Sequence, residues 1–109
     1  MKLTEHAKDR ITERVGLPKK AVDKNAVEAL EKGLSRHECK GRLGRYIKYI
    51  TIKHRLGSNL RIWNGFVYVF TRSRLITVLP LPPEHRDTAT KLLRKKRDMK
   101  LKEVEEQAV

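Results

Sequence analysis

Residues 60–70 read Leu60-Arg61-Ile62-Trp63-Asn64-Gly65-Phe66-Val67-Tyr68-Val69-Phe70, and this stretch contains the clearest structural signal in the chain. Two runs of β-forming residues flank Asn64-Gly65, a pair that favours a two-residue type I′ turn because both turn positions need positive φ. Such a turn places Trp63 opposite Phe66, Ile62 opposite Val67 and Arg61 opposite Tyr68. We therefore expect an antiparallel sheet at the centre of the fold.

A third strand is expected over residues 75–79, between the polar turn Arg72-Ser73-Arg74 and the sequence Pro80-Leu81-Pro82-Pro83, whose prolines cannot donate ladder hydrogen bonds. An even number of turn residues places Val69 opposite Ile76 and Tyr68 opposite Thr77. One face of the sheet is then aliphatic, with Leu60, Ile62, Val67, Val69, Ile76 and Val78. The other face is aromatic and is crossed by the polar row Arg61–Tyr68–Thr77, with Trp63, Phe66, Phe70, Leu75 and Leu79.

Helices are expected before and after this sheet. A first helix starts at the N-cap Thr4 and runs to about residue 15, with an apolar side formed by Leu3, Ala7, Ile11 and Val15. A second helix opens at Pro18 and stops at Gly33, with an apolar side formed by Ala21, Val22, Ala26, Val27 and Leu30. Residues 39–54 fit either a strand, because residues 46–52 are rich in β-formers, or a helix whose apolar face holds Cys39, Leu43, Tyr46, Ile47, Ile50 and His54. We favour the helix.

These elements predict an α+β fold, in which N-terminal helices pack on a small antiparallel β-meander. Residues 1–82 form a single basic domain. Residues 83–109 are charged and weakly periodic, so we expect a helix or a partly disordered extension there.

The positive charge lies mainly on the folded part of the chain. The whole sequence has 26 Lys and Arg against 13 Asp and Glu, a net charge of +13. Residues 1–82 hold 18 basic and 7 acidic side chains, whereas residues 83–109 hold 8 and 6. A basic body attracts polyanions and releases their counterions, which favours a nucleic-acid partner.

Several other classes are excluded by composition. The lone Cys39 allows no intramolecular disulfide and no Cys-based zinc site. The first residues are charged where a signal peptide is apolar, and the longest apolar stretch, residues 66–70, is too short to span a bilayer. No glycine-rich phosphate loop and no carboxylate cluster for two metals are found. We expect a cytoplasmic protein with no cofactor, no metal and no membrane partner.

Candidate catalytic residues lie on the first expected helix. His6, Arg10 and Arg14 follow one another at i, i+4 and i+8, and Arg14 falls inside the apolar stripe. A histidine can transfer a proton near neutral pH and arginines can stabilise a phosphorane, which suits metal-independent RNA cleavage. The alternatives are a surface histidine, and an arginine whose charge meets backbone carbonyls.

The pattern His6-Ala7-x-x-Arg10-x-x-Glu13-Arg14, the hairpin, and the closing strand Leu75-Ile76-Thr77-Val78-Leu79-Pro80-Leu81-Pro82 resemble small phage and bacterial proteins of the barnase–EndoU–colicin–RelE class. The likeness covers residues 4–82. It implies a metal-independent ribonuclease or toxin with helices on an antiparallel sheet. Carried over, the first-helix histidine and arginine are His6 and Arg10, the late-strand hydroxyl residue is Thr77, and Arg14 and Tyr68 lie in their company.

The sequence thus predicts an RNA-binding protein that acts as an endoribonuclease, with Tyr68 or Thr77 orienting the phosphate. The expected docking surface is basic, with one aromatic: Arg42, Arg45, Lys48, Arg61, Trp63, Arg72 and Arg74. The aromatic sheet face is either a platform for stacked bases or a second core layer under the C-terminal segment. Two alternatives stay open: a non-catalytic binder of ribosomal or other RNA, and a phage inhibitor of a host protein with an acidic surface. A toxin would in turn need an acidic antitoxin or immunity protein.

Overall fold

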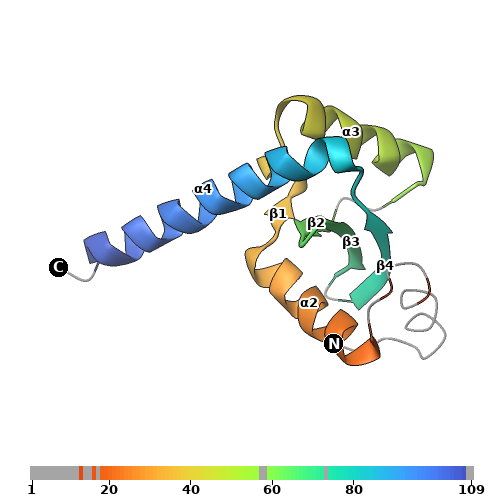
Figure 1. Ribbon diagram of the computed structural model, residues 1–109, viewed down its shortest axis with the longest axis horizontal. Coiled ribbons are helices and arrows are strands. Elements are labelled where there is room, and N and C mark those ends of the chain that lie inside the picture. Colours follow the sequence, from red (N-terminus) through yellow and green to blue (C-terminus); the bar gives the residue numbers. More distant parts are fainter. Residues whose placement is uncertain (1–12, 14–15, 17, 57–58, 73, 108–109) are drawn as a thin grey trace.

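The computed structural model describes Glu13, Gly16 and residues 18–56, 59–72 and 74–107, and its elements are labelled as in Figure 1. The fold is α+β, as the sequence predicts. An antiparallel sheet has the strand order β1 (Leu34–Ser35), β2 (Leu60–Trp63), β3 (Phe66–Thr71) and β4 (Arg74–Pro80). The helical elements are α2 (Lys19–Lys32), the 3-10 turn η1 (Arg36–Glu38), α3 (Gly41–Lys53) and α4 (Pro83–Gln107).

Helices cover both faces of the sheet, so that the described chain has two apolar layers (Figure 1). On one face α2 packs through Val22, Ala26 and Ala29 against Tyr68, Phe70, Leu75 and Val78. On the other, α3 and the first part of α4 pack on Leu60, Ile62, Val67 and Val69. The aromatic face is therefore a core layer, but α2 and not the C-terminal segment covers it.

The β2–β3 hairpin has the register predicted from its turn. Trp63 pairs with Phe66, and Arg61 pairs with Tyr68. Asn64 and Gly65 have φ values of 49° and 81°, the positive values that a type I′ turn needs. The Asn64 amide also donates to the Asn25 side chain of α2 at 2.9 Å, which fastens the hairpin tip to the helix below it.

The predicted β3–β4 register is wrong beyond the first two pairs. Thr71 pairs with Arg74 and Phe70 with Leu75, as an even turn requires, but the register then shifts between Val69 and Phe70. Past this bulge Tyr68 pairs with Val78 and Val69 with Thr77. Because one extra residue moves every later side chain to the other face, Val78 joins the α2 layer. Ile76, predicted to be in the core, is 48% exposed.

Close packing rather than a left-handed conformation explains the glycine that ends α2. Gly33 has a φ of −69°, so any residue could adopt its backbone angle. A Cβ at this position would lie 2.6 Å from the Ala29 carbonyl oxygen and 3.0 Å from that of Ile62. The predicted end of the helix is confirmed, whereas Val27, predicted to be in its apolar side, is 42% exposed.

The ambiguous segment is a helix, α3, and the charged C-terminal segment is a long helix, α4. Leu43, Ile47 and Ile50 of α3 are buried against the sheet, while His54, predicted on the same face, is exposed. Ala89 of α4 is buried in the same layer, and the last turns of the helix extend beyond the body (Figure 1). The expected first helix, residues 4–15, lies outside the described residues apart from Glu13.

Candidate functional site

The predicted catalytic residues do not all fall on described parts of the chain. His6, Arg10 and Arg14 lie outside the described residues. Tyr68 and Thr77 are described, and the structure separates them. Tyr68 belongs to the layer under α2, whereas Thr77 pairs with Val69 and shares the opposite face of the sheet. The predicted polar row therefore keeps its Arg61–Tyr68 pair and loses Thr77.

Tyr68 is poorly placed to act on a ligand. Its side chain is 1% exposed, and its hydroxyl is buried with no hydrogen-bond partner among the described residues. Burial, together with the charge of Glu28, raises the pKa of Tyr68 to about 12. The hydroxyl therefore stays protonated at neutral pH, and the phosphate-orienting role predicted for Tyr68 finds no support.

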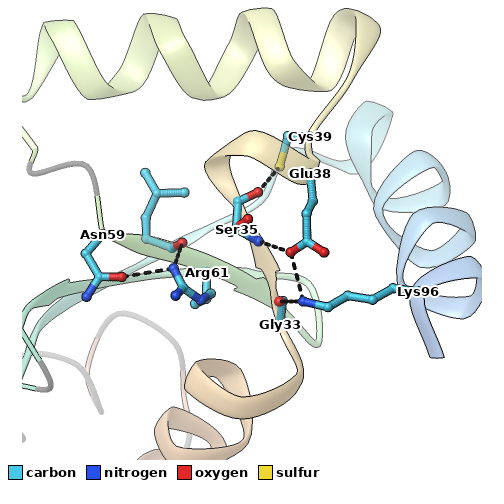
Figure 2. Close-up of polar contacts among 8 residues, drawn as sticks. Gly33, Ser35, Glu38, Cys39, Asn59, Arg61 and Lys96 are labelled. Atoms are coloured by element: carbon cyan, nitrogen blue, oxygen red, sulfur yellow. Dashed lines mark hydrogen bonds and ion pairs between the residues drawn. The ribbon is translucent and has the colours of Figure 1, made fainter. Parts of the chain in front are cut away.

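The predicted docking residues lie in three places. Arg42, Arg45 and Lys48 are exposed on α3, and Arg72 and Arg74 are exposed at the β3–β4 turn. Trp63, at the end of β2, is half-buried and lines a groove beside α4. Arg61 is also half-buried, and its guanidinium donates to the Asn59 side chain and the Leu60 carbonyl, each at 2.9 Å (Figure 2).

The outer side of α3 forms a continuous basic surface, called the α3 face here. It comprises the exposed residues Arg42, Arg45, Lys48, Tyr49, Ile52 and Lys53. Tyr49 is 57% exposed, and the Lys53 ammonium lies 5.5 Å from its ring centroid, within cation–π range. The helix has no acidic residue, so no carboxylate of its own competes for these cations.

The α3 face is part of a longer acid-free stretch that the sequence displays directly. Residues 39–83 contain no Asp and no Glu, and they contain nine Lys and Arg: Lys40, Arg42, Arg45, Lys48, Lys53, Arg55, Arg61, Arg72 and Arg74. This local run is a sharper signal than the net charge of the domain. It shows where the unneutralised charge lies along the chain.

A polar contact joins the residue that precedes β2 to the β3–β4 turn. The Asn59 amide donates to the Arg72 carbonyl at 2.7 Å, while its side-chain oxygen accepts from Arg61. Asn59 thus holds the start of β2 beside the turn that carries Arg72 and Arg74.

A second basic region is concave. A groove of about 900 Å³ lies between the β2–β3 hairpin, the end of α2 and one side of α4, and it is called the hairpin groove here. Its floor is apolar: Leu93 is half-buried there, and Ile62, Leu81 and Ala89 lie buried beneath it. The half-buried Trp63 and Phe66 stand at the hairpin side. Six cationic residues and one acidic residue line it: Lys32, Arg86, Arg94, Lys96, Arg97, Lys100 and Glu31.

One polar cluster holds α4 in place as the wall of this groove (Figure 2). The Lys96 ammonium donates to the Gly33 carbonyl and to the Glu38 carboxylate, each at 2.8 Å, and Glu38 accepts from the Ser35 N–H at 2.9 Å. Partial burial alone raises the pKa of Glu38, but the hydrogen bonds from Lys96 and Ser35 outweigh it and lower the pKa. Lys96 also brings positive charge to the C-terminal end of α2, where the helix dipole is negative.

The tryptophan of the groove has a fixed orientation. The Trp63 indole N–H donates to the Glu28 carboxylate of α2 at 3.2 Å, and the side chain packs partly on the layer under α2. Because the indole N–H is bonded to Glu28, the rest of the Trp63 ring presents an apolar surface to the groove. No sequence pattern indicates this groove, because its walls come from segments that are far apart in the chain.

Other sites have little support. Burial, and then the Glu38 charge, raises the pKa of the Cys39 thiol to about 11, so the thiol is unreactive near neutral pH. No cluster of three or more His, Cys, Asp or Glu that could hold a metal ion is found among the described residues. Within the same ranges, no helix is long and apolar enough to cross a bilayer. Comparisons with protein-family models, curated proteins and solved structures return no match.

Proposed function

We propose that this protein binds RNA, and that the α3 face and the β3–β4 turn attract its phosphates. One observation carries the proposal: residues 39–83 have nine cations and no carboxylate, and α3 presents Arg42, Arg45, Lys48 and Lys53 on its exposed side. Each cation that neutralises a phosphate releases counterions, and this supplies affinity without reading a base sequence. The exposed Tyr49 adds an aromatic ring on which a base can stack.

RNA is preferred over DNA because of the N-terminal motif. His6, Arg10 and Arg14 occur in the pattern that resembles metal-independent ribonucleases and toxins. Cleavage of the bound RNA stays a prediction that rests on these residues. Among the described residues, the separation of Tyr68 from Thr77 gives it no further support.

Binding and cleavage can be tested in one experiment. A labelled single-stranded RNA is titrated with the protein in EDTA, and anisotropy is measured between about 50 and 200 mM salt. We expect an affinity that falls steeply with salt. No binding at the lowest salt, or an affinity that is independent of salt, would contradict the proposal, and equal binding of a DNA strand would contradict the preference for RNA.

The same samples are then run on a denaturing gel. Product that forms in EDTA, and is lost in His6→Ala while binding is retained, identifies a metal-independent ribonuclease. Intact RNA throughout the titration identifies a non-catalytic binder. Either result leaves the binding proposal standing.

A further inference from the structure

The hairpin groove combines two features that the α3 face lacks. Its floor is apolar and recessed: the half-buried Leu93 is accessible there, with Ile62, Leu81 and Ala89 buried beneath it. An oriented tryptophan stands at its side, held by the bond from its indole N–H to Glu28. A surface that only attracted phosphates would need neither feature.

One side of α4 supplies a row of positive charge along the groove. Arg86, Arg94, Arg97 and Lys100 recur at spacings of eight, three and three residues, which keeps them on the groove side of the helix. At 1.5 Å per residue the row extends about 21 Å. Arg94 and Lys100 form no ion pair within the described part of the chain, and Arg97 lies 3.9 Å from its exposed neighbour Asp98. Such a row matches a chain of negative charges and not a single anion.

We propose that the hairpin groove binds a single-stranded segment of RNA, with phosphates along α4 and an unpaired base against Trp63. This inference rests on the proposed function and names the form of RNA that the protein selects. In a duplex the bases are stacked inside the helix and cannot reach a recessed apolar floor. Six cations against one carboxylate disfavour a basic or neutral partner.

Trp63 is the only tryptophan in the chain, so all of the tryptophan fluorescence comes from a residue that lines the groove. The intrinsic fluorescence of the full-length protein is measured during titration with a single-stranded RNA of about ten nucleotides, the length class that binds one site of this kind. The same strand annealed to its complement, and a glutamate oligomer of equal charge, are titrated in parallel. We expect the fluorescence to change with the single strand and to change little with the other two.

Paired charge variants locate the effect. Arg97→Gln with Lys100→Gln removes two cations of the groove, whereas Lys95→Gln with Lys102→Gln removes two exposed cations of α4 that do not line it. The first variant should weaken single-strand binding about tenfold and leave duplex binding close to that of the second variant.

Two kinds of result overturn the inference, and they differ from failure of the proposed function. If anisotropy shows that RNA binds while the Trp63 signal stays constant at saturation, RNA binding stands and the groove is not its site. If the duplex or the glutamate oligomer produces the same signal, the groove responds to charge and not to unpaired bases. If no RNA binds by anisotropy, the proposed function itself fails.

Discussion

The α3 face and the hairpin groove are both basic, but they differ in shape and in what lies beneath the charge. On α3 the cations project from the exposed side of a helix whose Leu43, Ile47 and Ile50 are turned into the core. In the groove the cations surround an apolar floor and an oriented Trp63. On the two proposals made above, the α3 face contributes mainly charge to the affinity, whereas the recessed apolar floor of the groove adds selection for unpaired bases.

The largest effect is expected from removal of the α3 face. The variant Arg42→Gln/Arg45→Gln/Lys48→Gln/Lys53→Gln should weaken RNA binding about a hundredfold near 0.1 M salt, because up to four phosphate contacts are lost. Anisotropy with single-stranded and duplex RNA should show similar losses for both. The matched control, Lys24→Gln/Lys91→Gln/Lys95→Gln/Lys102→Gln, removes four exposed cations from α2 and α4. An equal loss in the control would mean that net charge matters and the α3 face does not.

Gly33→Ala should lower the stability of the protein and disturb the hairpin groove more than the α3 face. The added Cβ would meet the carbonyl oxygens of Ala29 and Ile62 at 2.6 and 3.0 Å, and backbone atoms yield little. We expect a loss of about 2 to 3 kcal/mol in the free energy of unfolding, measured with urea. Since α2 borders the groove and not the α3 face, the Trp63 response of the folded variant should fall more than its phosphate binding. Unchanged stability would show that α2 can move away without cost.

Glu38→Gln tests the cluster that holds α4. Both Glu38 and Lys96 are about one-third exposed, so the expected loss of stability at pH 7 is only about 1 kcal/mol. Folding lowers the pKa of Glu38, and its contribution is therefore present above the ordinary carboxyl pKa and disappears as the pH falls through the folded value. Urea unfolding should show wild type and variant converging below about pH 4. A gap that persists at lower pH would contradict the assigned role, and Glu103→Gln on the exposed end of α4 controls for the lost charge.

Tyr68→Phe should have the smallest effect. Removing a buried hydroxyl without a partner leaves the free energy of unfolding unchanged or raises it by up to about 1 kcal/mol. RNA binding should also be unchanged. Because folding raises the pKa of Tyr68 to about 12, wild type should lose stability relative to the variant as the pH rises from about 10 to 12. If the variant lost RNA binding or any cleavage activity at neutral pH, Tyr68 would have a functional role.

Local patterns in the sequence were enough for the parts of the fold that local interactions determine. Asn64-Gly65 specifies its own turn, and the turn specifies the β2–β3 register. The apolar spacing of Leu43, Ile47 and Ile50 outweighs the β-forming composition of α3, because that spacing places all three side chains against the sheet.

Features that depend on distant partners could not be predicted in this way. The bulge that exposes Ile76 lies within a run of β-formers with no local signal for an extra residue. The strand β1 has two residues and exists through its pairing with Ile62 and Arg61. The hairpin groove depends on the contact of Lys96 with Glu38, which is 58 positions away in the chain.

The central claim is that the two basic regions bind RNA differently, and the salt dependence of single-strand affinity tests it most directly. The four-residue α3 variant is compared with Trp63→Leu over about 50 to 200 mM salt. We predict that the α3 variant flattens the slope of log K against log salt by about 2 to 3, since each lost phosphate contact removes about 0.7. Trp63→Leu should keep the wild-type slope and lose about tenfold in affinity at every salt concentration. Equal slopes for the two variants, or a flatter slope for Trp63→Leu, would contradict the account.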